Sequence, residues 1–408
     1  MRLASSLAVF VAGGVSCLPA AYAWGAVGMA LLFTYCPFMT TRILFIIGHE
    51  IVATIAQMYL HPTVLPTLCS ILDESPNCHL APIATWADKI KYRMRWSAAL
   101  HYVGAIDDYP PNDCAYPGPS GWAGRKEINV LDGIKNVTGL LADWVGQDAS
   151  DATASEALKF LVHFLGDMHQ PLHLTGRDRG GNSAKVIWDG RHTSELRFLL
   201  LLLLPDGFIL DLHSLWDGLL IAKAVRTVPR NYSRPLPYPA IENALRGTIY
   251  DPYIRRIMWE GTLNKWTDEI NKWLSCSVSA PESSVVVEPA EGTWQKVLSG
   301  LSSFSTLFKK HGVEINPDGE VVCPYFWSQP LSALNCDIVW PKQLTLKESG
   351  GDESSLEIAQ VELDTPEYAG VIEKRMLLEK LLAQGGVRLA GVLNYLFADQ
   401  GKAFVVDL

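Results

Sequence analysis

The chain has 408 residues, a formal net charge of −9 at neutral pH, 49% hydrophobic residues and 19% charged residues. This composition excludes wholesale disorder and allows a large buried core, although the length fits one large domain as well as two. The negative charge excludes nucleic-acid binding through a broad basic surface, because such contacts need Lys and Arg to displace counterions. Any phosphate chemistry would therefore need the charge of metal ions.

The first 23 residues, MRLASSLAVFVAGGVSCLPAAYA, have the pattern of a signal peptide. Arg2 precedes an apolar run, and Ala21 and Ala23 form the small-residue pattern that precedes a cleavage site. We expect cleavage after Ala23, which leaves Trp24 as the mature N-terminus. The alternative interpretation is an uncleaved anchor helix. The pattern predicts a secreted, extracellular protein.

Secretion permits disulfides, and six cysteines lie in the mature chain outside the interrupting segment 29–48 described below: Cys69, Cys78, Cys114, Cys276, Cys323 and Cys336. The sequence alone leaves fifteen connectivities. Two glycosylation sequons, at Asn136 and Asn231, fit the same compartment.

Helical periodicity dominates the chain and predicts an all-α fold. Residues 156–169 and 213–228 repeat apolar side chains at helical spacing. Residues 368–398 predict two helices broken at Gly385 and Gly386. The segments 277–293 and 343–360 are rich in Ser, Gly and Glu, which predicts variable surface loops.

The stretch HFLGDMHQPLH, residues 163–173, concentrates metal-ligating side chains. His163 and Asp167 are four residues apart and share one helix face. Pro171 is expected to end the helix, so that His173 points to a different place. His213 and Asp217 repeat the same spacing.

Asp88 and His101 add two further candidate ligands in aromatic and apolar surroundings. Imidazole and carboxylate suit zinc, and catalytic zinc sites combine a few such ligands with an open position. A lone histidine would more often be a hydrogen-bonded core residue, but the clustering favours a metal site. His169 points away from His163 and is expected to support the ligands from behind.

At this point the sequence resembles the S1/P1 family of secreted zinc-dependent single-strand nucleases of fungi and plants. The matching blocks, in chain order, are WG at residue 24, GHEIVATIAQ, IATWADKIKY, LHYV, DYPPNDC, HFLGDMHQPLH, RGGN, LHSLWDG, LDTPEYAG and RLAGVLNYLFA. The resemblance implies a single, mostly helical domain over residues 24–408, of the type shared with zinc phospholipase C, holding three zinc ions in a cleft.

The resemblance also implies a ligand set. One zinc takes Asp88, His101, His163 and Asp167, and a second takes Asp167, His49 and the backbone amine and carbonyl of Trp24. The third takes His173, His213 and Asp217. Lys91 and Asn182 match positions near the scissile phosphate, so that Asp88, Lys91 and Asn182 are the expected catalytic residues. Tyr102 and Tyr109 are candidates for base stacking or for core packing.

The family's chemistry implies cleavage of single-stranded DNA and RNA to 5′-phosphorylated products, together with release of nucleosides from 3′-nucleotides, and we expect a monomer without a protein partner. One alternative is a zinc phospholipase C-like enzyme. The other is an inactive metal-binding protein, because two segments interrupt the family pattern.

The interrupting segments are residues 29–48 and 195–211. The first separates Trp24 from His49 by 25 residues instead of the five expected from the family pattern. We interpret both segments as retained introns, since deleting them restores continuous family sequence. The alternative for the first is a genuine membrane-associated segment, because it is apolar and of about spanning length.

Overall fold

The structure is a computed structural model that describes residues 37–75, 78–188, 210–276, 322–344 and 361–398. The chain divides into two compact units, Met1–Leu44 and Phe45–Leu408, and the second unit carries the site described below. The predicted signal peptide, Trp24, residues 29–36 of the first predicted insertion and residues 195–209 of the second lie outside the described residues. Residues 37–48 of the first insertion form the start of helix α2 (Pro37–Met58). Among the described residues, no helix combines the length and apolar character that crossing a bilayer requires.

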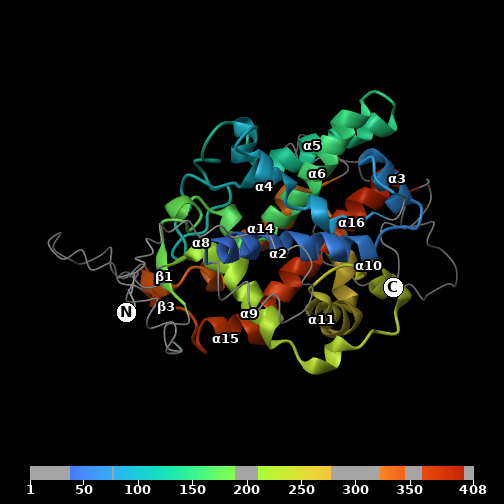
Figure 1. Cartoon of the computed structure of the whole chain (residues 1–408). Coiled ribbons are helices and arrows are strands. Elements are labelled where there is room, and N and C mark those ends of the chain that lie inside the picture. Colours follow the sequence, from blue (N-terminus) through green and yellow to red (C-terminus); the bar gives the residue numbers. More distant parts are fainter. Residues whose placement is uncertain (1–36, 76–77, 189–209, 277–321, 345–360, 399–408) are drawn as a thin grey trace, which may run out of the picture. The chain divides into compact units, whose positions relative to one another are not determined.

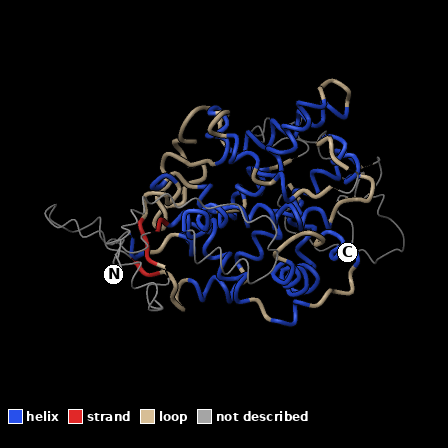
Figure 2. Tube along the Cα trace, in the orientation of Figure 1, coloured by secondary structure: helices blue, strands red, loops and turns tan. Residues whose placement is uncertain are grey.

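Helices make up most of the described residues (Figure 1, Figure 2). The longer ones are α2 (Pro37–Met58), α3 (Val64–Ile71), α5 (Val130–Val145), α6 (Asp151–Met168), α9 (Leu220–Thr227), α14 (Pro324–Leu334), α15 (Ala369–Arg375) and α16 (Leu377–Phe397). Shorter helices are α4 (Trp86–Ile90), α8 (Leu212–Ser214), α10 (Pro239–Ala244), α11 (Asp251–Arg256) and α12 (Ile270–Leu274). The mostly helical fold expected from the sequence is confirmed.

Short 3₁₀ and π segments connect these helices. The 3₁₀ segments are η1 (Ala81–Ile83), η2 (Arg95–His101), η3 (Pro171–Leu174), η4 (Arg177–Arg179), η6 (Arg230–Ser233), η8 (Thr267–Glu269) and η11 (Lys342–Leu344). The π segments are η5 (Leu215–Leu219), η7 (Ile257–Lys265) and η10 (Asn335–Val339). A π-turn in place of an α-turn is frequent at functional sites, and η5 carries Asp217.

Three short strands form a sheet in the order β2-β1-β3, made of β1 (Lys185–Ile187), β2 (Leu210–Asp211) and β3 (Val361–Glu362). β2 runs antiparallel to β1, with Lys185 opposite Asp211, and β3 runs parallel to it. Asp211 also caps α8 by accepting the backbone N–H of Ser214. The last residue of the second predicted insertion thus orients the helix that carries His213.

Helix α6 is the centre of the core, since α5, α16, α3 and α4 all pack against it. The side chain of Ser150 caps its start by accepting the N–H of Thr153. Leu158, Leu161 and Phe164 are fully buried, and burial of each stabilises the fold by roughly 1.5–3 kcal/mol. His163 and Asp167 lie on the same buried helix, so the apolar packing fixes their position.

The predicted helix break at Gly385-Gly386 is wrong, because α16 runs through both glycines. The break lies at Met376, whose φ of 53° ends α15 in the left-handed conformation. A Cβ atom at Gly386 would approach Ile55 to 2.5 Å, and one at Gly385 would lie 3.2 Å from Val52. The glycines therefore permit α16 to pack closely on α2 instead of breaking the helix.

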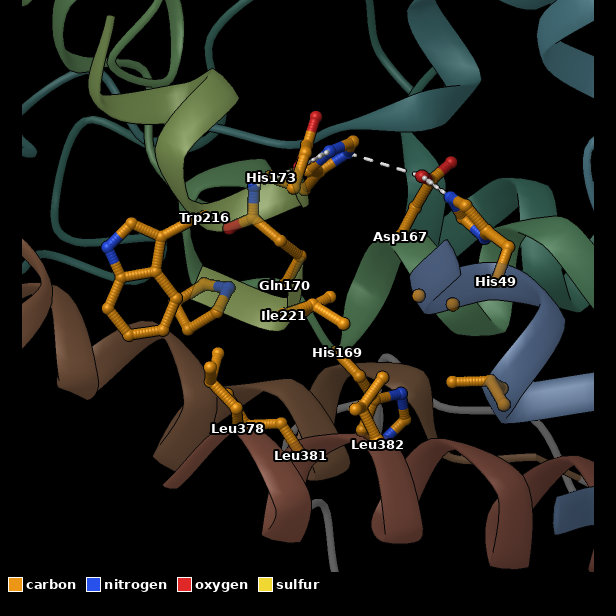
Figure 3. A pocket seen from close by; sticks show the side chains of 15 residues that line it. His49, Asp167, His169, Gln170, His173, Trp216, Ile221, Leu378, Leu381 and Leu382 are labelled. Atoms are coloured by element: carbon orange, nitrogen blue, oxygen red, sulfur yellow. Dashed lines mark hydrogen bonds and ion pairs between the residues drawn. The ribbon is translucent and has the colours of Figure 1, made fainter. Parts of the chain in front are cut away.

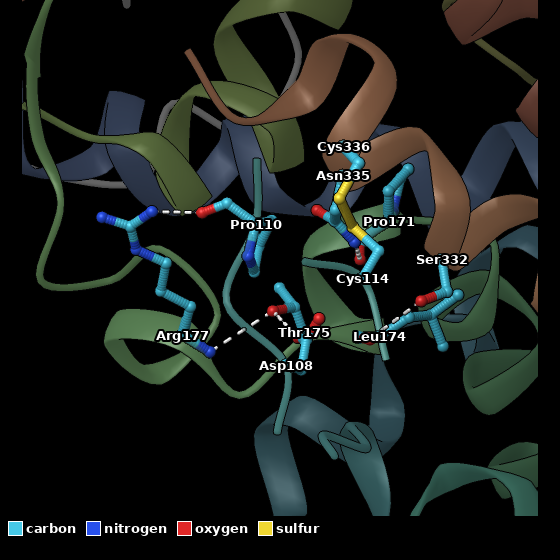
Figure 4. Close-up of a disulfide and its surroundings, with 10 residues drawn as sticks. All are labelled: Asp108, Pro110, Cys114, Pro171, Leu174, Thr175, Arg177, Ser332, Asn335 and Cys336. Carbon is cyan, nitrogen blue, oxygen red and sulfur yellow. Dashed lines mark hydrogen bonds between the residues drawn. A yellow bond between two sulfur atoms is a disulfide. The ribbon is translucent and has the colours of Figure 1, made fainter. Parts of the chain in front are cut away.

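The described cysteines form three disulfides: Cys69–Cys78, Cys114–Cys336 and Cys276–Cys323. Cys114–Cys336 joins the loop after η2 to η10 over a separation of 222 residues (Figure 4). Nearby, Asn335 donates a hydrogen bond to the carbonyl of Pro171. The disulfide therefore ties the loop to the segment that carries His173.

Candidate metal centre

Eight of the nine predicted ligands lie in the described residues, and the structure brings them together in three groups: Asp88, His101 and His163; His49, His163 and Asp167; and His173, His213 and Asp217. Within each group the ligand atoms lie within 4.8 Å of one another. The ninth, Trp24, lies outside the described residues. The first two groups share His163, and Asp167 also faces His101 and His173.

The closest group surrounds the oxygen Oδ2 of Asp167. His101 Nδ1 lies 3.0 Å and His163 Nε2 lies 3.2 Å from this oxygen, and the two ring nitrogens are 3.1 Å apart. Asp88 Oδ1 is 3.7 Å from His163 Nε2 and 3.8 Å from His101 Nδ1. Helix α6 supplies two of these side chains, α4 supplies Asp88, and η2 ends at His101.

The second group is formed around Oδ1, the other carboxylate oxygen of Asp167, which faces His49. His49 Nε2 is 3.3 Å from Asp167 Oδ1, and the His49 ring stacks on His163 at a centroid distance of 4.0 Å. This contact requires Gly166, because a Cβ atom there would lie 2.3 Å from His49 Nδ1. The glycine between Leu165 and Asp167 therefore allows α2 to bring His49 to the centre.

The third group lies beyond the end of α6. His213 Nε2 is 3.2 Å from Asp217 Oδ2, and His173 Nε2 is 3.7 Å from Asp217 Oδ1. Helix α6 ends at Met168, and Pro171 starts η3, as the sequence predicts. His173 Nδ1 also lies 3.5 Å from Asp167 Oδ1, so the third group adjoins the other two.

Backbone carbonyls fix the tautomer of three of the histidines. Nδ1 of His163 donates to the carbonyl of Ala84 at 2.7 Å, that of His173 to His101 at 2.6 Å, and that of His213 to Gly180 at 2.8 Å. A carbonyl only accepts, so Nδ1 carries a proton and Nε2 is the ring nitrogen left to face a metal ion. Metal-ligating histidines in proteins usually show this arrangement.

The spacing of the ligand atoms suits zinc. Zinc–nitrogen and zinc–oxygen bonds of about 2.0–2.1 Å place neighbouring tetrahedral ligands about 3.3 Å apart. The contacts of Asp167 Oδ2 with His101 and His163, at 3.0 and 3.2 Å, are close to that value. Nitrogen and carboxylate ligands without cysteine also fit a catalytic zinc site. The residues present therefore fit zinc.

Charge pairing holds the buried carboxylates of the centre ionised. Burial would raise the pKa of Asp167, but the imidazoles of His163 and His173 hold it well below its usual value. Burial would likewise raise the pKa of Asp217, which His213 and His173 hold well below its usual value. Negative ligands are thus ready for a cation.

The two other residues predicted to act at the phosphate differ in their surroundings. Nζ of Lys91 lies 2.9 Å from Asp88 Oδ1, which places a cation beside the first group. The side-chain amide of the exposed Asn182 donates to the carbonyl of Arg179. No contact of Asn182 with the three groups is present in the described residues. Its loop nevertheless adjoins the third group, because Gly180 accepts the His213 hydrogen bond.

A pocket opens between the second and third groups (Figure 3). His49, Asp167 and His173 line one side, and the apolar side chains of α16 line the other: Leu378, Leu381 and Leu382. His169 also borders this pocket, but its Nδ1 bonds the carbonyl of Leu165 and its Nε2 accepts from the buried Arg388. His169 therefore packs behind the ligands.

The loop after His101 is tied to the segment after His173 (Figure 4). The N–H of Val103 donates to the carbonyl of His173 at 2.8 Å. The buried carboxylate of Asp108 accepts from the hydroxyl of Thr175, and Arg177 donates to the carbonyl of Pro110. The loop is thus anchored at several points beside the centre.

This anchoring leaves the two tyrosines of the loop exposed. Tyr102 is 54% and Tyr109 is 42% exposed, which excludes core packing as the whole role of either ring. The guanidinium of Arg177 stacks on the Tyr109 ring, with its carbon 4.1 Å from the ring centroid.

Two features of the site were missed by sequence reasoning. Gln170 bonds both the backbone of η3 and Asp217, and nothing in its local pattern distinguishes it from a surface glutamine. The segment 89–96 combines alternating basic residues with exposed aromatic side chains. This second feature could have been recognised from the sequence, because four basic residues alternate there in an acidic chain: Lys89, Lys91, Arg93 and Arg95.

The fold and the site define a mostly helical protein whose histidine and aspartate side chains converge as the ligands of a metal centre would. More narrowly, the chain belongs to the S1/P1 nuclease family, because the sequence model of that family matches residues 46–312. It is accordingly a zinc-dependent nuclease that acts on nucleic acid.

Curated relatives support the family assignment. The chain is 30% identical to nuclease P1 of Penicillium citrinum over 60% of this chain and 85% of the fungal protein. It is 30% identical to endonuclease 2 of Arabidopsis thaliana over 56% of this chain and 68% of the plant protein. It is 26% identical to endonuclease 3 of the same plant over 87% of this chain and 89% of the relative.

Proposed function

We propose that this chain binds three zinc ions and hydrolyses single-stranded DNA and RNA. The observation that carries the proposal is the convergence of eight ligand side chains into three adjoining groups. In this assignment Asp88, His101, His163 and Asp167 hold one ion, and Asp167, His49 and the N-terminus at Trp24 hold the second. His173, His213 and Asp217 hold the third.

Zinc held by these residues would activate water for attack near neutral pH and would neutralise charge on the phosphoryl oxygens. Asp167 offers one carboxylate oxygen to each of the first two groups. Lys91 lies at the edge of the first group, where its ammonium is placed to stabilise negative charge on a bound phosphate. Asn182 is proposed to contact the same phosphate region.

The proposed products are 5′-phosphorylated nucleotides, and 3′-nucleotides are proposed to release nucleosides. The exposed rings of Tyr102 and Tyr109 support a preference for single strands, because a base must leave the duplex stack before it can lie on an aromatic side chain. Tyr102 follows His101 directly in the chain, so its backbone lies beside the first group.

We also propose that the protein is secreted and that Trp24 becomes its N-terminus. Three disulfides support an oxidising compartment. The active species is proposed to be a monomer.

The test uses the full chain, secreted with its own leader and loaded with zinc. We expect close to three zinc ions per chain, rapid release of 5′-phosphorylated nucleotides from single-stranded DNA, and slow release from a duplex of the same sequence. The matched inactive control is Asp88→Asn. Release of phosphocholine from phosphatidylcholine vesicles without cleavage of DNA would select a phospholipase instead, and bound zinc without either activity would show an inactive metal-binding protein.

A further inference from the structure

The segment from Lys89 to His101 departs from the acidic character of the chain. Four basic residues alternate with other residues in it, and no acidic residue occurs between Asp88 and Asp107. The overall charge of −9 excludes a broad basic surface, but it does not exclude a narrow one. Such a strip needs only a few unpaired cations at the right place.

Both ends of this segment are fixed at the candidate metal centre. It begins after Asp88 and ends at His101, and these two side chains approach within 3.8 Å. Its second half is the 3₁₀ helix η2 (Arg95–His101), which rises about 2 Å per residue. Arg95 therefore lies about 12 Å along the helix from His101, a length that stacked nucleotides at about 3.4 Å each cover in three to four steps.

The cations of the strip are available to a ligand. Arg93 and Arg95 are exposed, and neither has an ion pair or a side-chain hydrogen bond with any other residue that the structure describes. Lys91 differs from them, because it pairs with Asp88 at the centre itself. Arg93 and Arg95 thus add positive charge to the segment that follows the Lys91–Asp88 pair.

An exposed aromatic residue, Trp96, follows Arg95 directly in the chain. Trp96 is 59% exposed although its ring lies only 5.7 Å from that of Phe160, measured between centroids. Phe160 is buried in α6, three residues before His163. The core therefore supports the indole on one side and leaves the rest of it open, as in a platform on which a nucleic-acid base stacks.

We infer that Arg93, Arg95 and Trp96 form an extended binding track for the single strand beyond the scissile phosphate. The inference rests on the proposed nuclease function. The track binds phosphates through the two arginines and stacks a base on Trp96, so that it recognises a polynucleotide several nucleotides long. A mononucleotide is too short to reach it.

The experiment measures binding and cleavage separately on the zinc-loaded full chain. The variants are the double substitution Arg93→Gln with Arg95→Gln, and Trp96→Ala. The control is Arg226→Gln with Arg230→Gln, which removes the same charge from two other exposed arginines. Binding is measured by anisotropy of a labelled 12-nucleotide thymidine strand with phosphorothioate linkages. Cleavage is measured on the normal 12-mer and on a 3′-mononucleotide.

We expect the double substitution Arg93→Gln with Arg95→Gln to raise the Kd and the KM of the 12-mer at least tenfold. The KM of the mononucleotide should change at least tenfold less. The slope of log Kd against log salt should fall by about 1.4, since each lost single-strand phosphate contact contributes about 0.7. Trp96→Ala should weaken 12-mer binding roughly fivefold or more. The control pair should leave the ratio of 12-mer to mononucleotide KM at the wild-type value.

Equal losses on the 12-mer and the mononucleotide would overturn the track, because they would indicate damage to the centre. Wild-type affinity of the arginine pair for the 12-mer would also overturn it, as would tighter binding to a duplex or to vesicles containing phosphatidylserine. The Trp96→Ala result counts only if the Tm and zinc content of this variant match the wild type. If they do not match, the double arginine variant alone tests the track. Arginine-dependent binding without any cleavage would support the track while refuting the proposed nuclease function.

Discussion

The side-chain amide of Gln170 donates a hydrogen bond to Oδ1 of Asp217 at 2.7 Å, while its oxygen accepts the N–H of Leu172 at 2.6 Å. The backbone N–H fixes which end of the amide is the oxygen, so the NH₂ group must face the carboxylate. Gln170 thereby connects the end of α6 with the third group and orients one of its ligands from behind.

Gln170→Met should therefore weaken the third metal position without emptying the other two. Loss of a residue that orients a ligand typically lowers metal affinity 10- to 100-fold. We expect zinc titration of the apoprotein to show one site weakened by that factor and two sites unchanged. Gln57→Met is the matched control, because Gln57 also accepts a backbone N–H, that of Leu80. A similar loss of zinc in both variants would contradict the role of Gln170.

Asp167→Asn should damage two zinc positions together. Its two carboxylate oxygens face different groups, at 3.3 Å from His49 and at 3.2 Å from His163, and the amide has neither the charge nor the second ligand oxygen. His213→Ala should mainly empty the third position. Metal analysis of purified protein should give about one zinc per chain for the first variant and about two for the second. Equal zinc loss would show that Asp167 is not shared.

Asp108 should make folding stability depend on pH through the loop that carries Tyr109. Burial raises the pKa of Asp108 to about 6, although the hydroxyl of Thr175 and the N–H of Gly176 partly offset this. Because the folded-state pKa lies above the ordinary value, this carboxyl contributes stability that is complete below pH 4 and lost as the pH rises through 6. The effect is at most ~3 kcal/mol.

Asp108→Asn should accordingly raise the Tm by a few degrees at pH 8 and change it little at pH 4. The amide keeps an oxygen for the bond from Thr175 and cannot ionise. The comparison is made against Asp107→Asn, the neighbouring and more exposed carboxylate, so that titration of the metal ligands cancels. A Tm difference between the two variants that is independent of pH would rule out this assignment.

The N-terminal amine should be required for one zinc ion, since it is a ligand only after cleavage at Ala23 and only when deprotonated at the metal. Two otherwise identical chains are compared, one processed by its leader and one made with an initiating Met before Trp24. The Met-extended form should keep its fold, measured by circular dichroism, but hold one zinc fewer and lose most nuclease activity. Three zinc ions and full activity in the extended form would show that Trp24 is not a ligand.

Local spacing in the sequence determined much of the site. The four-residue spacing of His163 and Asp167, and again of His213 and Asp217, requires both pairs to share a helix face. Pro171 directed His173 away from α6 because a proline cannot continue a helix. Apolar periodicity likewise predicted the helix over residues 156–169, because the 3.6-residue turn of a helix sets the spacing of the side chains that it buries.

The tertiary structure decided what depends on contacts between distant residues. The disulfide Cys114–Cys336 and the contact of His101 with His163 join segments that no local period relates. The glycines at 385 and 386 resemble a helix break in isolation, yet packing against Val52 and Ile55 makes them the interior of α16. Gln170 acquired its partner in the same way, because only the folded chain brings Asp217 within reach of an amide 47 residues earlier.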